Sequence, residues 1–262
     1  MLYSEVEFLI RQELREPALY NTVLEAIAHG NTQLNDIFTK TQIDKSKISV
    51  YLKNLIELQI LEREFSAPSS GKEQSVSTRG LYRITDNFFR FWFSFMCASL
   101  SDLETGDAGG VFANEVQPQL NAFASPVFET ICREFLRRKN HRNELPFRIS
   151  KLGRWWGKLN KIVLSEDGTS KLTTVDAEID IVAVDKTSKN YILCECKFRN
   201  SEMDISDLER LKEKSSIAGK GATIRYALFS KSGFTRNLIT QAKDSESIML
   251  FSLEDIAGTD NR

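Results

Sequence analysis

The sequence predicts an α/β protein of the α+β type, in which a helical N-terminal part precedes a part built on a mixed sheet. Two observations support this fold class. Apolar residues recur at spacings of three and four up to about residue 60, as in amphipathic helices. After residue 120, short apolar runs typical of strands alternate with helical ones. The length of 262 residues suggests two domains or one large one.

Composition excludes several classes of protein. Apolar residues make up 41% and charged residues 27%, which is typical of a globular chain. Lys and Arg total 35 against 36 Asp and Glu, so any nucleic-acid surface must be a local patch. The four cysteines lack zinc spacing, which favours reduced thiols and a cytoplasmic location. We expect no secretory signal and no membrane span, because no apolar run is long enough.

The first 85 residues contain the elements of a winged helix-turn-helix domain. A helical face at Leu19, Val23, Leu24 and Ile27 is followed by two further helical stretches, the later one capped by Asp44 or Ser46. Residues 60–65 and 80–84 then alternate as two strands, joined by the polar segment 66–79. Two short helices, a longer helix and a hairpin with a long wing predict the winged-helix fold.

Basic residues gather on the predicted recognition helix. The segment 40–53 has four lysines, Lys40, Lys45, Lys47 and Lys53, and a single acid, Asp44. This excess of positive charge would suit a duplex phosphate backbone. We therefore predict DNA contacts for Lys45, Lys47 and Lys53. The alternative is a solvated helix face in a domain that docks to proteins.

An aromatic helix links the two halves. It covers residues 86–96, is capped by Asp86, and is expected to bury its rings between domains. The second half then predicts strands and helices in alternation. The expected strands are 147–149, 161–164, 177–184, 191–198, 223–229 and 248–251. The expected helices are 127–136, 205–217 and 235–243.

The strands 177–184 and 191–198 are expected to form an antiparallel hairpin. With the turn centred between Thr187 and Ser188, apolar residues pair with apolar ones from Val184 and Tyr191 to Ile181 and Cys194. The same register places Asp180 opposite Glu195, and Glu178 opposite Lys197. Opposed carboxylates repel each other unless something neutralises them.

A divalent cation would resolve this repulsion. Mg²⁺ binds one or two carboxylates, keeps several waters and accepts phosphate oxygens. Lys197 shares a strand face with Glu195, so its ammonium would lie beside the cation. This arrangement indicates hydrolysis of a phosphodiester. The alternative is an exposed hairpin face with a Glu178–Lys197 surface ion pair.

These residues resemble a known superfamily of nucleases. Asp180, followed after a hairpin by Glu195-Cys196-Lys197 and preceded by Glu129 on a helix, resembles the restriction-endonuclease-like PD-(D/E)xK pattern. The resemblance implies that Asp180 and Glu195 bind Mg²⁺ or Mn²⁺ with the Cys196 carbonyl, that Lys197 is the catalytic cation, and that Glu129 supports the metal or orients water.

A closer resemblance covers nearly the whole chain. Residues 19–95, the run 147–157 with its Gly-Arg-Trp-Trp-Gly, the Glu-Ile-Asp at 178–180 and residues 194–197 look like the C-terminal half of archaeal-type ATPases. That half joins a winged helix to an ATPase-associated domain of unknown function. Arg154 with its two tryptophans would bind phosphate or stack on a base, or else Arg154 partners a carboxylate and the tryptophans are core.

The resemblance implies a P-loop ATPase module upstream, and we expect this chain to lack it. The segment 66–73 has Ser66 where a phosphate loop needs Gly and Glu73 where it needs Ser or Thr, so we predict no ATP binding. The ATPase would be a separate polypeptide, or the gene a truncated product.

The expected domains are a winged helix (1–85), an aromatic helix and linker (86–120) and a nuclease-like domain (121–262). The predicted function is that of a metal-dependent DNA endonuclease. A homodimer is one state that the resemblance allows. The alternative is a non-catalytic DNA-binding or ATPase-docking module with a degenerate nuclease fold.

Overall fold

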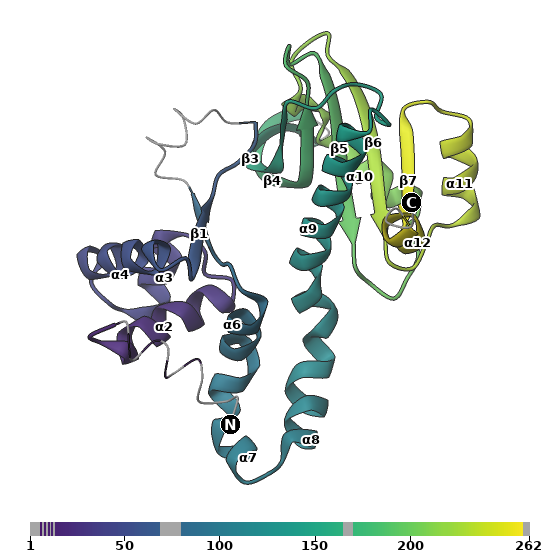
Figure 1. Ribbon diagram of the computed structural model, residues 1–262. Coiled ribbons are helices and arrows are strands. Elements are labelled where there is room, and N and C mark those ends of the chain that lie inside the picture. The colour runs from purple at the N-terminus through teal and green to yellow at the C-terminus, as the bar shows by residue number, and fades with distance from the viewer. Residues whose placement is uncertain are drawn as a thin grey trace. The chain divides into compact units, whose positions relative to one another are not determined.

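The computed structural model describes residues 6, 8, 10, 12, 14–68, 80–164 and 170–258 (Figure 1). It divides into two compact units, residues 1–65 with 71–119 and residues 66–70 with 120–262. No helix within the described ranges is long and apolar enough to cross a membrane. Most of the predicted wing, residues 69–79, lies outside the described residues.

The first unit has the element order that a winged helix requires. Its helices α2, α3 and α4 precede the antiparallel strands β1 and β2. Their bounds are α2 Pro17–Ala28, α3 Leu34–Thr41, α4 Lys45–Glu57, β1 Leu61–Glu64 and β2 Leu81–Ile84. The Asp44 side chain accepts a hydrogen bond from Ser46 N, which confirms the predicted cap of α4. Beyond this order, the winged helix stays a prediction.

The aromatic segment after β2 belongs to the core of this unit. Asp86 caps α6 by accepting from Phe88 N and Phe89 N, as predicted. Trp92 and Phe93, however, are each 1% exposed and pack with residues of α2 and α4, although an interdomain position was expected. The unit continues through α6 Asn87–Phe91, π-helix η2 Trp92–Met96, η3 Cys97–Ser99, α7 Leu100–Glu104, α8 Ala108–Val111, π-helix η4 Phe112–Val116 and η5 Gln117–Gln119.

The second unit is a five-stranded mixed sheet between helices, which confirms the α+β class. Strands β3, β4 and β5 pair antiparallel, and β5, β6 and β7 pair parallel, in that spatial order. The bounds are α9 Leu120–His141, β3 Lys151–Leu164, β4 Ser170–Val184, β5 Asn190–Lys197, α10 Ile205–Glu213, η6 Ser215–Ile217, β6 Thr223–Ser230, α11 Arg236–Lys243, β7 Ile248–Ser252 and α12 Leu253–Ala257.

Each face of the sheet has its own apolar core. Helices α9 and α12 cover the face that carries Ile181, Cys194 and Cys196. Helices α10 and α11 cover the opposite face, which carries Val182 and Leu193. Because side chains alternate along β5, Glu195 and Lys197 belong to the α10 face, and the two cysteines belong to the α9 face.

The start of β3 differs from the prediction. Residues 147–149 were expected to form a strand, but they form a loop. The Asn140 side chain of α9 binds the backbone of this loop. Ile149 N donates to Asn140 Oδ1 at 2.7 Å, and Asn140 Nδ2 donates to the Ile149 carbonyl at 3.3 Å. The strand begins at Lys151 and contains the Gly-Arg-Trp-Trp-Gly run.

Two residues of the segment after β1 pair with β3. Ala67 N donates to the Arg154 carbonyl at 2.8 Å, and Ser66 Oγ donates to the Trp156 carbonyl at 2.9 Å. Trp156 N donates back to Ser66 Oγ at 2.9 Å. These residues therefore extend the hydrogen bonding of the second unit beyond its outer strand.

Phe135 of α9 is the central contact between this helix and the sheet. It is fully buried, and its ring centroid lies 5.0 Å from Phe251 and 6.0 Å from Phe229. We expect Phe135→Ala to lower the free energy of unfolding by about 3 to 5 kcal/mol, because it leaves a cavity among aromatic rings. Ile131→Ala, on the same helix but 44% exposed, should change it by less than about 0.5 kcal/mol. Urea unfolding followed by circular dichroism measures both, and equal losses would contradict this packing.

Candidate active site

Asp180 lies in a β-bulge of strand β4. Gly153 of β3 pairs with Val182, but Trp155, two residues later, pairs with Ile179, so Asp180 and Ile181 together oppose the single residue Arg154. The bulge shifts the strand's alternation, because Ile179 and Val182 both pack on the α10 face. Asp180 is thereby turned toward the neighbouring strand β5.

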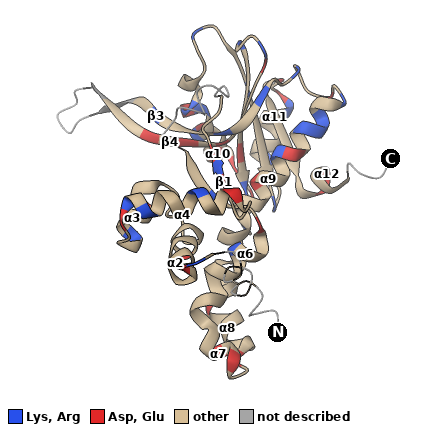
Figure 2. Ribbon diagram, turned by 60° about the vertical axis from the view of Figure 1, so that its left-hand side comes forward, with Lys and Arg blue, Asp and Glu red and all other residues tan. Residues whose placement is uncertain are grey.

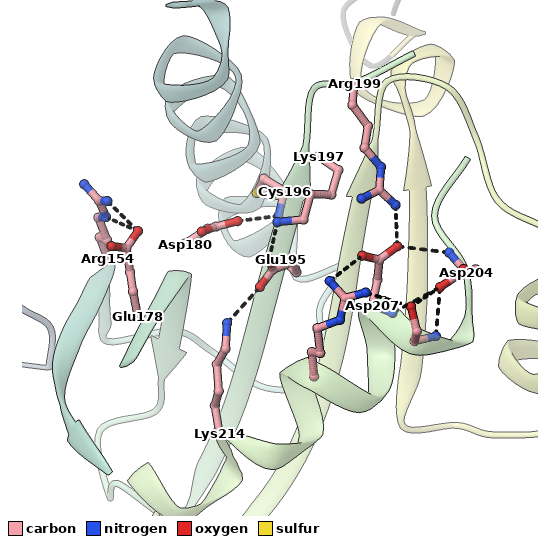
Figure 3. A network of polar contacts seen from close by, with 12 residues as sticks. Arg154, Glu178, Asp180, Glu195, Cys196, Lys197, Arg199, Asp204, Asp207 and Lys214 are labelled. Atoms are coloured by element: carbon pink, nitrogen blue, oxygen red, sulfur yellow. Dashed lines mark hydrogen bonds and ion pairs between the residues drawn. The ribbon is translucent and has the colours of Figure 1, made fainter. Parts of the chain in front are cut away.

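The predicted β4–β5 register is confirmed in its apolar part and ends at the bulge. The four pairs from Val184 and Tyr191 to Ile181 and Cys194 are those expected. The next predicted pair, Asp180 with Glu195, does not form in the strand ladder. Asp180 Oδ2 instead accepts a hydrogen bond from Cys196 N at 2.7 Å (Figure 3). Its carboxylate is therefore held beside the residue that separates Glu195 from Lys197.

The predicted partnership of Glu178 with Lys197 is wrong. Glu178 pairs with Trp156 on β3, and its carboxylate binds Arg154, whose Nε donates to Glu178 Oε1 at 2.8 Å. The bulge accounts for this difference, because it moves Glu178 out of the register that Lys197 would need. Arg154 is thus a carboxylate partner, as one of the two sequence interpretations proposed, and Trp155 packs against the core on the α10 face.

Both oxygens of Glu195 are bound by lysines. Lys197 Nζ donates to Glu195 Oε1, and Lys214 Nζ donates to Oε2 at 3.2 Å. The Glu195 side chain is only 12% exposed, whereas those of Lys197 and Lys214 are 30% and 24% exposed. The Glu195 side chain is therefore largely buried, and both of its oxygens are bound by ammonium groups.

The environment of Asp180 makes its charged form unfavourable. Burial first, and then the negative charges of Glu195 and Glu129, raise the pKa of Asp180 to about 7. The hydrogen bond from Cys196 N and the charge of Lys197 act in the opposite direction. Glu129 of α9 therefore lies near enough for its charge to act on Asp180, and its role at a metal stays a prediction.

Lys197 is held as an ammonium. Burial alone would lower its pKa, but the charge and hydrogen bond of Glu195, with the charge of Asp180, outweigh burial and raise the pKa above the ordinary value. A lysine in this state can stabilise negative charge but cannot serve as a base. This suits the role predicted for Lys197 as a catalytic cation.

The donor set fits a hard divalent cation. Asp180 and Glu195 supply carboxylate oxygens, and after burial the negative charges of Glu195 and Glu129 contribute to the raised pKa of Asp180. Within the described ranges, no group of three or more His, Cys, Asp or Glu side chains forms a ready metal site. Water and phosphate oxygens would complete the coordination, as is usual for Mg²⁺.

The cysteine thiols take no part in such a site. Burial raises the pKa of the Cys194 and Cys196 thiols well above the ordinary value, and both side chains pack in the core under α9. This agrees with the expectation that only the carbonyl oxygen of Cys196 could contribute a ligand.

A pocket of about 240 Å³ opens beside Glu195. One wall is the β3–β4 hairpin, and the other is α10 with its C-terminal end. The lining residues are Leu159, Asn160, Val175, Ala177, Glu195, Asp207, Arg210, Glu213 and Lys214. The carboxylate of Glu195 is therefore reached from an open pocket rather than from a sealed core.

Sequence reasoning missed three charged residues around the site. Lys214 follows α10, and Arg199 follows β5 and donates to the buried Asp207 Oδ2 at 2.6 Å. The Asp204-x-x-Asp207 spacing before an apolar helical face is a helix-start signal that could have placed Asp207. Nothing in the sequence distinguishes Lys214 from its neighbour Lys212.

The lysines predicted to contact DNA lie on α4 and are all exposed. Figure 2 shows how basic and acidic residues are distributed along the ribbon. Lys45 Nζ donates to Asn35 Oδ1 at 2.9 Å, and Lys53 pairs with Glu57 at 3.7 Å. Lys47 projects from the first turn of the helix. These side chains are available to a ligand, because binding it would break only the weak surface contacts of Lys45 and Lys53.

Comparison with known proteins matches part of the chain to a family of unknown function. Residues 92–210 match the family DUF234, described as archaeal and bacterial proteins of unknown function. The match confirms the family part of the expected resemblance, a domain of unknown function. The matched range includes Asp180, Glu195 and Lys197.

The chain is also similar to an archaeal protein. Over 260 residues it is 32% identical to the uncharacterized protein MJECL04 of Methanocaldococcus jannaschii. The matched region covers 98% of this chain and 52% of the relative. The chain thus spans about half the length of this curated relative.

Two crystal structures give weaker similarities. Protein VC1899 from Vibrio cholerae has 14% identity and a TM-score of 0.37, over 94% of this chain and 55% of its own. The protein of unknown function AF1548 has 15% identity and a TM-score of 0.28, over 48% of this chain and 58% of its own. At these scores neither structure supports a statement about fold or function.

The pKa of Asp180 predicts how stability depends on pH in the presence of a chelator. The folded state holds the Asp180 proton more tightly than the unfolded chain does, so this stabilisation is complete below the unfolded pKa of 3.8 and is lost as the pH rises through about 7. Between pH 5 and pH 8 we expect Asp180 to lower the free energy of unfolding by roughly 2 to 3 kcal/mol.

Asp180→Asn should remove this decline, because an amide carries no charge. Asp176→Asn, at an exposed position of the same strand, should keep it. Urea unfolding at the two pH values measures the difference, and parallel pH profiles for wild type and Asp180→Asn would contradict the assigned burial.

Proposed function

We propose that the second unit is a metal-dependent nuclease domain that hydrolyses phosphodiester bonds of DNA. The observation that carries this proposal is the hydrogen bond from Cys196 N to Asp180, which brings one carboxylate beside a second carboxylate and an ammonium on the neighbouring strand. The PD-(D/E)xK resemblance of the same residues supports it.

Each residue has a distinct role in this proposal. Asp180 and Glu195, with the Cys196 carbonyl, would hold Mg²⁺ or Mn²⁺, which when bound supplies Lewis-acid stabilisation of phosphate oxygens. Lys197 stabilises the negative charge that develops on the phosphate during attack by water. Glu129, on the α9 side of Asp180, orients that water.

A second candidate function is a non-catalytic module that binds DNA or docks to a separate P-loop ATPase. The observation that favours it is the charge balance of Glu195, whose two oxygens already bind Lys197 and Lys214. A site satisfied by lysines is stable without a cation. The two candidates differ in whether the chain turns over substrate.

Cleavage of supercoiled plasmid with Mg²⁺ or Mn²⁺ tests the nuclease proposal. We expect Asp180→Asn and Lys197→Ala each to lower the rate by about 100-fold or more, because each removes charge stabilisation at the reacting phosphate. Asp176→Asn and Lys189→Ala, at exposed positions of the same strand and hairpin, should keep the wild-type rate. Absence of metal-dependent cleavage, or equal rates in all variants, would favour the non-catalytic module.

We further propose that α4 binds the phosphate backbone of duplex DNA through Lys45, Lys47 and Lys53. The proposal rests on their exposure along one short helix. We expect the double variant Lys45→Glu, Lys47→Glu to weaken duplex binding by about tenfold or more and to reduce the salt dependence by about two counterions.

Fluorescence anisotropy with a labelled duplex, measured across a range of salt, tests this proposal. The control is Lys243→Glu, which reverses an exposed charge at the end of α11. An unchanged affinity in the double variant would assign α4 to protein docking instead.

A further inference from the structure

Lys214 occupies a position that a bound metal would contest. Its Nζ lies 3.2 Å from Glu195 Oε2, while Lys197 binds the other oxygen (Figure 3). Glu195 therefore has no oxygen left that is not already bound by an ammonium. A cation ligated by Glu195 would lie close to both ammonium groups and would compete with them for the carboxylate, since positive charges this close repel each other strongly.

The fold holds the base of Lys214 firmly in place. At the start of α10, Asp207 is buried and accepts from Arg199, which ties the helix to the end of β5. Just after Lys214, Ser215 Oγ and Tyr226 OH are hydrogen bonded at 2.8 Å, which ties the end of the helix to β6. The Lys214 backbone is thus fixed, and only its long side chain is free to change partner.

Lys214, unlike Lys197, has an alternative place to go. It lines the 240 Å³ pocket with Arg210, one helical turn earlier. Two carboxylates of α10, Asp207 and Glu213, also line this pocket, and Asp207 is neutralised by Arg199. Once Lys214 leaves Glu195, its ammonium and the Arg210 guanidinium would face the same opening.

We propose that Lys214 is an exchangeable counter-ion, which binds Glu195 until a divalent cation displaces it and then binds a phosphate of the DNA strand in the adjacent pocket. The inference rests on the proposed metal-dependent function and adds a positioning residue to it. Lys214 links metal binding to substrate binding, because its charge becomes available to phosphate only when the metal is bound.

Titration of the full chain with Mn²⁺ tests the first half of the exchange. We expect Lys214→Gln to tighten Mn²⁺ binding about tenfold, because the competing charge is removed while a hydrogen-bond donor is kept. Lys214→Arg, which keeps the charge, should bind within about twofold of wild type. Lys212→Gln, on the same helix and paired with Glu209 at the surface, is the matched control and should also be unchanged. Equal or weaker Mn²⁺ binding by Lys214→Gln would overturn the proposal.

Binding of a labelled duplex in EDTA and in Ca²⁺ tests the second half. With Ca²⁺ bound, Lys214→Gln should reduce the salt dependence of affinity by about one counterion relative to wild type. In EDTA the two proteins should agree within about twofold, because Lys214 is then engaged by Glu195. An equal loss in both conditions would overturn the exchange, and circular dichroism of each variant verifies its folding.

These outcomes are separable from failure of the nuclease proposal. If Lys214→Gln binds Mn²⁺ more tightly but the protein never cleaves DNA, the exchange proposal stands and the nuclease proposal fails. If the protein cleaves DNA but Lys214→Gln leaves the Mn²⁺ affinity unchanged, the nuclease proposal stands and the exchange proposal fails.

Discussion

The arrangement of the site depends on one hydrogen bond, from the Cys196 backbone to the carboxylate of Asp180. It forms where β4 and β5 stop pairing, and it replaces the ladder contact that a regular hairpin would make there. The bulge opposite Arg154 makes it possible by turning Asp180 toward β5. In a regular strand, Asp180 would follow Ile181 in the ladder and lie directly opposite Glu195, instead of accepting from Cys196 N.

The charges gathered around this bond are balanced only in part. Glu195 and Glu129 act on Asp180 as like charges, and Lys197 and Lys214 bind Glu195. Charged groups at such low exposure are costly unless they are paired, so the surrounding cores must hold them together. Packing on both faces of the sheet, by α9 and by α10, supplies that support. An incomplete balance of this kind is what a site for a cation requires.

The sequence predicts local features well and the bulge not at all. Apolar pairing was sufficient to place Val184 against Tyr191, and side-chain oxygens identified the caps at Asp44 and Asp86. The bulge, in contrast, arises from pairing with the first half of β3 near Gly153, which the local apolar pattern did not predict as a strand. For the same reason the partner of Glu178 was misassigned. Lys214 escaped notice because its role comes from where α10 ends in space.

The pairing of Ser66 and Ala67 with β3 has a further consequence. An outer strand of a sheet offers unpaired amide and carbonyl groups to any other extended chain, and proteins commonly shield it to avoid aggregation. Here Ala67 N and the Ser66 hydroxyl occupy such groups at Arg154 and Trp156. This short segment therefore shields the edge of the sheet from pairing with another chain, next to the β-bulge that positions Asp180.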